Sequence, residues 1–559
     1  MKHILGKGEL YIWLSGAFLA FSIIMIGGML VLITLKGAGH FAPLPITRFQ
    51  VVTADGDSLD MLGQVFSEEP IPKEVSEMYG YESDDSPVRF LVRIGNRERF
   101  GQDFKWINAP DIRNSLRPAN AVCMERTEYG NAYGFVEAIN LGADRRIENE
   151  VDAWDAFAGI HEHVLSLTEK LRSIEKYKIG DLNYVLEEHR LRALELQYDL
   201  ANHAIEEAEF RTETGIIAKE KQNTETLFRA HQHEIDSLRK IAAEYVLTLR
   251  IVGGEQDGET MEIPVASIVR AYKPNVMTLG ADLEFYAAKT WEFLFDDPRE
   301  ANAEGGVFPA IFGTVMMVLL MTIAAVPFGV LSALYLREYA TEGPFVRTVR
   351  IAVNNLAGVP SIVFGMFGLG FFVYFIGGNI DALFFPERLP NPTYGTGGIL
   401  WASLTLALLT VPVVIVATEE ALAAIPRGMR EGSLALGATK WETIRRVVLP
   451  TATPGIMTGA ILAMARGAGE VAPLMITGVV KLATEMPFDS HFPFFHLDRK
   501  FMHLGFHIYD VGFQTSNVEA NIGMVYTTTL LLLVIILLLN LAAIIIRAKL
   551  RRKYRLAGF

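Results

Sequence analysis

Residues 431–450 read EGSLALGATKWETIRRVVLP and lie between two long apolar runs. Glu431 is predicted to open a first helix, and Gly437 permits a tight turn after it. A second helix is predicted to end at Leu449-Pro450, because proline disfavours helix continuation. Apolar residues recur at helical spacing in both halves, namely Leu434, Ala435 and Ala438, then Trp441, Ile444, Val447 and Val448. The pattern predicts a short amphipathic helix-turn-helix at a membrane surface, and a passive interfacial connector would fit it equally well. We refer to residues 431–450 as the polar loop.

Charge is divided unevenly along the 559 residues, a length that predicts two or more structural units. Residues 40–306 hold 49 acidic and 29 basic residues, whereas the remainder holds 15 acidic and 22 basic residues. An acidic soluble block therefore accompanies a basic membrane block. Nucleic-acid binding is disfavoured, since contact with phosphate backbones requires a concentrated positive surface.

Six apolar runs are long enough to cross a bilayer and predict an α-helical polytopic membrane protein with six spans. The first run exceeds the apolar core of a secretory signal, so we expect an uncleaved anchor flanked by Lys2 and Lys7. Prolines inside later runs indicate helices that pack against other helices. The runs are 10–35, 308–335, 353–376, 399–418, 455–478 and 523–547, and the prolines are Pro327, Pro360, Pro412 and Pro473.

An α+β domain is predicted between the first two spans. Residues 88–94, a Gly95-Asn96 turn and residues 97–107 predict a β-hairpin. Residues 147–245 predict a long coiled-coil helical hairpin, with breaks at Gly180-Asp181 and Gly215. Strands are expected again at 245–252 and after a turn that contains Gly253, Gly254, Asp257 and Gly258.

The domain boundaries follow from these patterns. We expect an anchor span (1–39), a β-rich part (40–144), the coiled-coil hairpin (145–245), a second β-rich part (246–304) and a five-span membrane domain (305–559).

Metal and disulfide chemistry are not expected in this chain. The pairs His161/His163 and His231/His233 are spaced i, i+2, which places their members on different sides of a helix. The lone Cys123 can form neither an internal disulfide nor a cysteine-ligated zinc site by itself.

Lysine and arginine gather in alternate short loops, which predicts the orientation of the spans. Both termini and the polar loop are expected in the cytoplasm, and the α+β domain in the periplasm or outside the cell. The basic residues are Lys2, Lys7, Arg337, Arg347, Arg350, Arg427, Arg430, Lys440, Arg445, Arg446, Arg547, Lys549, Arg551, Arg552, Lys553 and Arg555.

The polar loop resembles the signature of the permease subunits of ABC importers. Glu431, Gly437, Leu449 and Pro450 match it, while Gly432, Ser433 and Val447 depart from it by small or β-branched replacements. Three further stretches resemble the permeases of phosphate importers: LAGVPSIVFGMFGL (356–369), TEEALAAIPRGMREGS (418–433) and TPGIMTGAILAMARGAGEVAPLM (453–475). The resemblance covers about residue 305 to the end.

This resemblance implies a type I ABC-importer permease in the inner (plasma) membrane. It implies docking to a dimeric ATPase through Glu431, Gly437, Ala438, Leu449 and Pro450, with ATP-Mg bound by that ATPase and no cofactor in this chain. A second phosphate permease subunit and an external phosphate-binding protein are the other implied partners. The sequence has no GxxxxGK[ST] loop, so we expect a transporter subunit and not an enzyme.

Arg466 and Glu470 are the strongest candidates for a site inside the membrane. Four residues apart, they share a helix face, and ionisable residues within a span usually pair or line a pathway. Arg466 could offer a donor fork to an oxyanion while Glu470 positions it; an ion pair that only joins helices fits as well. In the resembling permeases this motif is associated with the translocation path. Gly358, Pro360 and Ser361 could present backbone donors to an anion or serve close helix packing.

Two alternatives stay open. An importer of another oxyanion or of a phosphonate has the same organisation, and a membrane sensor or scaffold would act through its external coiled coil. The negative charge of the external domain repels phosphate over roughly a Debye length. We therefore expect this domain to contact a partner protein, namely the binding protein, the second permease or an envelope component.

Overall fold

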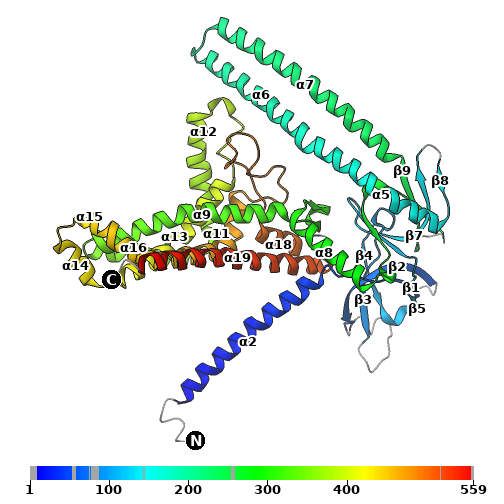
Figure 1. Ribbon diagram of the computed structural model, residues 1–559, viewed down its shortest axis with the longest axis horizontal. Coiled ribbons are helices and arrows are strands. Elements are labelled where there is room, and N and C mark those ends of the chain that lie inside the picture. Colours follow the sequence, from blue (N-terminus) through cyan, green and yellow to red (C-terminus); the bar gives the residue numbers. More distant parts are fainter. Residues whose placement is uncertain are drawn as a thin grey trace.

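The computed structural model describes residues 9–52, 58–72, 74, 76, 87–142, 145–253, 258–515 and 518–555. The expected flanking charges Lys2 and Lys7, and the turn residues Gly254 and Asp257, lie outside these residues. A bundle of long helices carries an α+β domain at one end, and a helical hairpin projects from that domain (Figure 1). We call this end of the bundle the domain end. The opposite end, which carries the polar loop, is the loop end.

The chain is a multi-pass membrane protein whose described residues contain six candidate spans. The helices of the membrane part are α2 (Glu9–Gly39), α9 (Phe308–Leu334), α10 (Pro344–Leu356), α11 (Ser361–Phe367), α12 (Gly378–Phe384), α13 (Ile399–Ala423), α14 (Arg427–Ala435), α15 (Lys440–Thr443), α16 (Leu449–Ala468), α17 (Ala472–Thr477), α18 (Leu504–Phe513) and α19 (Val518–Arg555). The π-helical segments Tyr335–Tyr339, Gly368–Gly377 and Ile444–Val448 extend or join them.

Two expected spans are displaced in the structure. The run expected at 353–376 lies at 361–384, because α10 and the turn before Pro360 take up its first residues. The run expected at 455–478 lies at 440–468, because the helix continues through Pro450, and residues 472–477 form the separate helix α17. In both cases the apolar run includes residues outside the spanning helix, before residue 361 in the first case and after residue 468 in the second.

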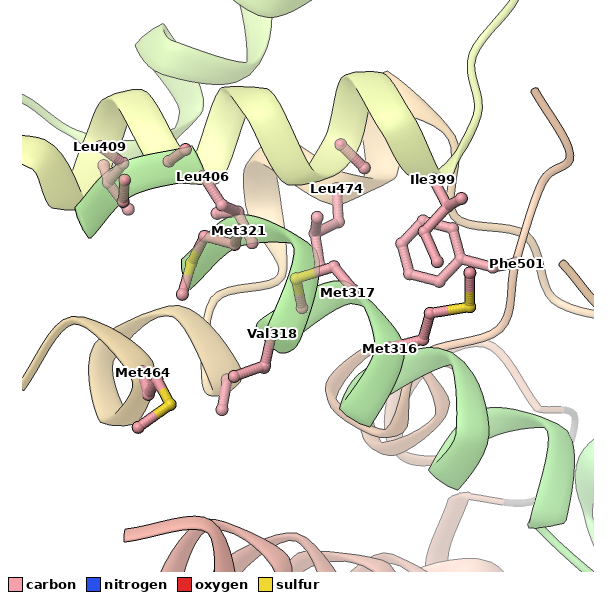
Figure 2. Close-up of a cluster of buried hydrophobic side chains, with 14 of the residues drawn as sticks. Met316, Met317, Val318, Met321, Ile399, Leu406, Leu409, Met464, Leu474 and Phe501 are labelled. Carbon is pink, nitrogen blue, oxygen red and sulfur yellow. The ribbon is translucent and has the colours of Figure 1, made fainter. Parts of the chain in front are cut away.

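The core of the bundle lies between α9, α13 and α16. Met317 and Met321 of α9 pack with Leu406 of α13 and Met464 of α16 (Figure 2). Small residues allow close approach elsewhere: a Cβ atom on Gly459 would lie 2.8 Å from the Cβ atom of Ala417. Such contacts are typical of membrane helices, which gain stability from packing.

Two antiparallel sheets and a two-stranded ribbon build the β part of the domain. The first sheet has the order β4-β3-β2-β1-β5 and the second has the order β10-β9-β7-β6-β11, with β8 added to β7. The strands are β1 (Ile46–Val52), β2 (Ser58–Pro70), β3 (Val88–Arg93), β4 (Phe104–Asn108), β5 (Ile112–Leu116), β6 (Val122–Arg126), β7 (Ala132–Leu141), β8 (Arg146–Ile147), β9 (Tyr245–Arg250), β10 (Thr260–Pro264), β11 (Ile268–Tyr272), β12 (Pro298–Arg299) and β13 (Glu304–Gly305).

The predicted β-hairpin at 88–107 is confirmed, since β3 and β4 pair antiparallel with Phe90 opposite Ile107. Its connection differs from the expected two-residue turn. Gly95 and Asn96 have φ of 61° and 52°, and they lead into a one-turn helix, α4 (Arg97–Phe100), before β4 begins. The strands expected at 245–252 and after the following turn are also present and pair as β9 and β10.

Long helices emerge from the second sheet: α5 (Glu150–Ser173), a π-helical segment (Ile174–Ile179), α6 (Gly180–Ala201) and α7 (Glu207–Ala243). The expected breaks at Gly180-Asp181 and Gly215 are wrong, because both glycines are helical. A glycine inside a helix costs only about 1 kcal/mol, which the flanking residues outweigh. The chain instead turns between α6 and α7, where His203 has φ of 58°. We call the packed pair α6 and α7 the arm (Figure 1).

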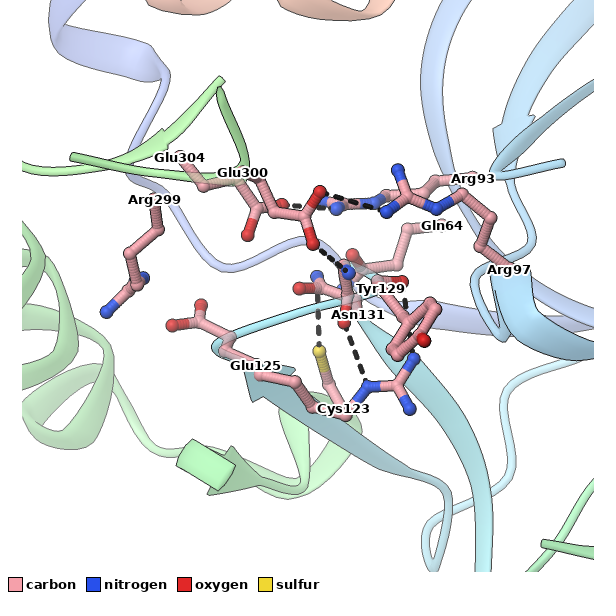
Figure 3. Close-up of polar contacts among 12 residues, drawn as sticks. Gln64, Arg93, Arg97, Cys123, Glu125, Tyr129, Asn131, Arg299, Glu300 and Glu304 are labelled. Atoms are coloured by element: carbon pink, nitrogen blue, oxygen red, sulfur yellow. Dashed lines mark hydrogen bonds and ion pairs between the residues drawn. The ribbon is translucent and has the colours of Figure 1, made fainter. Parts of the chain in front are cut away.

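A polar junction fastens the α+β domain to the bundle. Arg93 of β3 pairs with Glu304, and Arg97 Nη2 donates to Glu300 Oε2 over 3.0 Å (Figure 3). Burial alone raises the pKa of Glu304, but attraction and a hydrogen bond from Arg93 outweigh it, so this pKa lies below its usual value. Both glutamates lie in the short segment between α8 (Leu279–Phe295) and α9.

The segment between α8 and α9 contains a left-handed turn. Glu300, Ala301 and Asn302 have φ of 44°, 52° and 77°, a region that costs L-residues energy. Glu300 accepts from the Gly130 amide (3.1 Å) in the α+β domain, whereas Asn302 Nδ2 donates to Lys481 O (2.9 Å) in the bundle. Contacts on both sides therefore hold the strained turn in place.

The junction predicts unequal effects of two similar substitutions. Arg93→Met removes the cation beside the buried Glu304 and is expected to destabilise the chain by about 3–5 kcal/mol. Arg48→Met breaks an outlying pair with Asp60, whose side chains are 39% and 27% exposed, and is expected to cost at most about 1 kcal/mol. Thermal unfolding of the full chain in detergent measures both. Equal losses would contradict a junction role for Arg93.

Candidate functional site

The polar loop is built from three consecutive helical pieces at the loop end of the bundle. Helix α14 begins at Arg427, earlier than the start that was expected at Glu431, and it ends at Ala435. Gly437 has φ of 86°, a left-handed conformation in which any other L-residue would be strained. Helix α15 then begins at Lys440, and its N-cap residue is Thr439, whose hydroxyl accepts from the Glu442 amide while the Glu442 carboxylate accepts from the Thr439 amide. This capping box fixes the direction in which the second helix leaves the turn.

The expected helix end at Leu449-Pro450 is wrong. The π-helical segment Ile444–Val448 leads directly into α16, in which Pro450 occupies the first turn. Proline lacks an amide hydrogen, but the wider π turn changes the hydrogen-bond partners before it, and the Thr451 hydroxyl donates to Val447 O (2.7 Å). The polar loop is therefore continuous with a membrane span, so a displacement of α15 is carried into α16.

Arg430 fastens α14 to two spans at once. Its Nη2 donates to Glu338 Oε1 (2.9 Å) and to Leu422 O (2.8 Å), and its Nη1 donates to Ile425 O (2.9 Å). Glu338 belongs to the end of the α9 helical run, and Leu422 to the last turn of α13. A guanidinium is suited to this task because its planar fork serves several acceptors without losing its charge.

Further contacts make the polar loop one rigid unit. Ser433 Oγ lies 2.9 Å from Thr443 Oγ1, which joins α14 to the second helix. Lys440 Nζ lies 4.7 Å from the ring centre of Tyr339. Ile444 and Val448 are buried, and Val448 packs with Leu422 of α13.

The apex of the polar loop exposes apolar side chains. Leu436 is 90% exposed and Trp441 is 53% exposed, with Met429 and Leu434 also exposed nearby. Glu431 and Gly437 are exposed, whereas Ala438, Leu449 and Pro450 are half-buried. An apolar apex on a fastened loop is a surface suited to a protein partner.

Arg466 lies in the last turn of α16, whereas Glu470 lies beyond the end of that helix, so the expected shared helix face does not form. Arg466 Nε and Glu470 Oε1 are 3.9 Å apart, and the side chains are 34% and 22% exposed. The distance exceeds that of a hydrogen bond, so the Arg466 fork is not saturated by Glu470. The arrangement leaves guanidinium donors available to another acceptor.

Residues 358–361 approach the same region from another helix. Pro360 precedes α11, Gly358 is exposed, and Val359 packs against the cluster that contains Met464 and Leu474. A Cβ atom on Gly365 of α11 would lie 2.7 Å from the Cα atom of Pro473 in α17. The structure thus brings α11 against the segment that follows Glu470, and Ser361 begins that helix.

Sequence patterns missed the most important fastening of the polar loop. Arg430 stood out only as a basic residue, and its partner Glu338 lies 92 positions earlier. The available signal was Glu338 itself, an acidic residue beside Arg337 at the end of an apolar run. No group of three or more His, Cys, Asp or Glu side chains within the described ranges is placed to hold a metal ion.

Comparison with known proteins places this geometry in context. Residues 325–556 match the family described as binding-protein-dependent transport system inner membrane component. The phosphate transport system permease protein PstA of Mycobacterium leprae (strain TN) is 38% identical over 195 residues, which are 34% of this chain and 58% of that protein. The probable ABC transporter permease protein YqgH of Bacillus subtilis (strain 168) is 34% identical over 210 residues, which are 37% of this chain and 62% of that protein.

These matches are partial. The chain spans 58% of the length of the first of these relatives and 62% of the second. An inward-facing structure of the MetNI methionine ABC transporter is 20% identical and covers 43% of this chain and 94% of that chain, with a TM-score of 0.33. A likeness this low carries no argument about the fold.

Two glycines of the polar loop give a matched prediction. A Cβ atom would meet no heavy atom within 4 Å at either Gly432 or Gly437, but only Gly437 has positive φ. Gly437→Ala is expected to cost about 1–2 kcal/mol of local stability, whereas Gly432→Ala in α14 is expected to be neutral or stabilising by up to about 1 kcal/mol. Hydrogen exchange of the α14 and α15 amides measures both variants. Similar exchange in the two would show that the turn does not depend on its left-handed glycine.

Proposed function

We propose that the chain is the permease subunit of an ATP-driven phosphate importer, because residues 325–556 match the family of binding-protein-dependent transport system inner membrane components. The observation that carries this proposal is the rigid polar loop, which presents an exposed apolar apex and is fastened to two spans by Arg430. Relatives that are 36% to 39% identical and carry phosphate transport system permease names support the choice of phosphate.

The proposed assembly is that of a type I importer in the inner membrane. The polar loop and both termini face the cytoplasm, and the α+β domain with its coiled-coil arm lies in the periplasm or outside the cell. The domain divisions at 39, 144, 245 and 304 belong to this proposal. A dimeric ATPase that binds ATP-Mg, a second permease subunit and an external phosphate-binding protein complete it.

In this proposal, transport couples to ATP hydrolysis through Glu431, Gly437, Ala438, Leu449 and Pro450. Closure of the ATPase moves the polar loop as a rigid unit. Arg430 passes that displacement to α9 and α13, and the continuous helix passes it to α16. The spans tilt and open the pathway to one side and then to the other.

The translocation path is proposed to use Arg466 and Glu470, together with Gly358, Pro360 and Ser361. Arg466 binds the oxyanion through guanidinium donors that Glu470 leaves available, and Glu470 keeps the side chain in place. The half-exposed position of both residues supports access from a pathway. An importer of another oxyanion or a phosphonate is the second candidate, because the same fork suits these anions.

A membrane sensor or scaffold acting through the arm is a further alternative. The long, exposed helices α6 and α7 favour it, whereas the fastened polar loop has no purpose in it. Uptake of phosphate distinguishes the two functions directly.

A pair of variants separates binding from helix packing at Arg466. Arg466→Gln is expected to lower phosphate uptake by tenfold or more, since the charged donor is lost. If Arg466 binds the anion, Arg466→Gln/Glu470→Gln stays equally inactive. Recovery in the double variant would instead identify a structural ion pair. Radiolabelled phosphate uptake by cells measures each variant at matched membrane levels, and excess sulfate or phosphonate as competitor identifies the preferred anion.

A further inference from the structure

The arm returns from the α+β domain to touch the bundle at its domain end. We call residues 478–503, which connect α17 with α18, the rim loop. Tyr184 of α6 stacks on His491 with ring centres 4.2 Å apart, and its hydroxyl donates to Phe492 O (3.1 Å). Asp181 Oδ1 lies 3.2 Å from His491 Nε2. Helix α6 also contacts the 3-10 turn Pro386–Arg388 that follows α12.

The rim loop is a firm base for this contact. Asp489 accepts from Arg499 Nη1 (2.5 Å) and from the His491 amide (2.9 Å), and it lies 2.9 Å from His496 Nε2. Burial alone raises the pKa of Asp489, but these partners outweigh it and lower the pKa to about 2. The carboxylate therefore stays charged at ordinary pH and keeps the loop folded around it.

The contact between the arm and the rim loop is largely exposed. Asp181 is 60% exposed and Phe492 is 79% exposed. Water screens polar contacts at such exposed positions, so the Tyr184–His491 ring stack is the main specific interaction between the arm and the rim loop. Helix α6 has no buried residue, so the arm can leave its contacts with the rim loop and with Pro386–Arg388 without opening a hydrophobic core.

The two helical connections at the base of the arm differ. The π-helical segment Ile174–Ile179 interrupts the α geometry between α5 and α6, a feature frequent at functional sites, whereas α7 runs unbroken beside it and packs Ile235 and Leu238 against Ile174. Lys176 Nζ pairs with Asp297 over 3.0 Å, just before α9. Because α7 packs against this segment, α6 and α7 move together when Tyr184 leaves the rim loop.

The rim loop is bonded directly to α13. The first amides of that helix, Ile399 and Leu400, donate to Arg499 O (2.9 Å) and Leu497 O (3.0 Å). The other end of α13 is held by Arg430. Helix α13 thus joins the rim loop, which the arm contacts, to the polar loop.

We propose that the arm acts as a strap. In this conformation it contacts the rim loop and thereby restrains α13, and it must leave the rim loop during transport. The inference rests on the proposed function only in requiring an ATP-driven permease; it does not depend on the transported anion. Helix α13 cannot tilt freely while its first turn, the rim loop and the seated arm form one hydrogen-bonded unit.

Cysteine pairs test the strap in the full chain, assembled with its ATPase and second permease. In a Cys123→Ala background, Tyr184→Cys/Phe492→Cys is joined by a short bismaleimide, which ties the arm to the rim loop. Arg192→Cys/Glu213→Cys replaces an ion pair between α6 and α7 and serves as the matched control, because it crosslinks the arm only within itself. The strap predicts a tenfold or greater loss of uptake for the first pair and no loss for the control.

A second measurement separates this proposal from the choice of substrate. The rate of crosslinking at Tyr184→Cys/Phe492→Cys is compared with and without ATP, whether or not phosphate is transported. The strap predicts slower crosslinking during ATP turnover. Unchanged crosslinking, or full activity of the crosslinked chain, would overturn it. If the wild-type chain does not take up phosphate but crosslinking of the cysteine variant still slows with ATP, the proposed substrate is refuted and the strap is supported.

Discussion

The guanidinium of Arg430 is the group on which the loop end of this molecule depends. It neutralises Glu338 at the end of the α9 run and satisfies two carbonyl groups at the end of α13. Without this cation, Glu338 would be a largely buried carboxylate with no charge partner, and helix-terminal carbonyls would lose donors. The polar loop is rigid relative to the spans because one side chain meets all of these needs.

A comparable constraint operates at the domain end. The left-handed turn Glu300–Asn302 is held by the α+β domain on one side and by the bundle on the other. The domain is therefore an attached body, not a loosely tethered appendage. Helix α13 lies between the two regions, with rim-loop carbonyls at its first turn and Arg430 at its last. Movements that reach either end of α13 act on one continuous helix, in which Pro412 near the middle removes one backbone hydrogen bond.

Local and periodic features of this fold could be predicted from the sequence. Apolar runs predicted six spans, alternation predicted the β3–β4 hairpin, and the polar loop stood out by its composition. Predictions failed where tertiary context overrides local preference. Pro450 continues a helix because a π-helical segment precedes it, and Gly180 and Gly215 remain helical because their neighbours favour the helix. The contacts of Arg430 with Glu338, and of Tyr184 with Phe492, join residues 92 and 308 positions apart, which one sequence cannot reveal.

The most direct test of the account is ATP-driven phosphate accumulation in proteoliposomes that contain this chain with the proposed ATPase, second permease and external phosphate-binding protein. Arg430→Gln should leave ATP hydrolysis measurable but lower accumulation by tenfold or more, because the loop is no longer fastened to α9 and α13. Arg427→Gln, an exposed change in the same helix, should transport normally. Accumulation at the wild-type level by a folded, assembled Arg430→Gln variant would contradict the account.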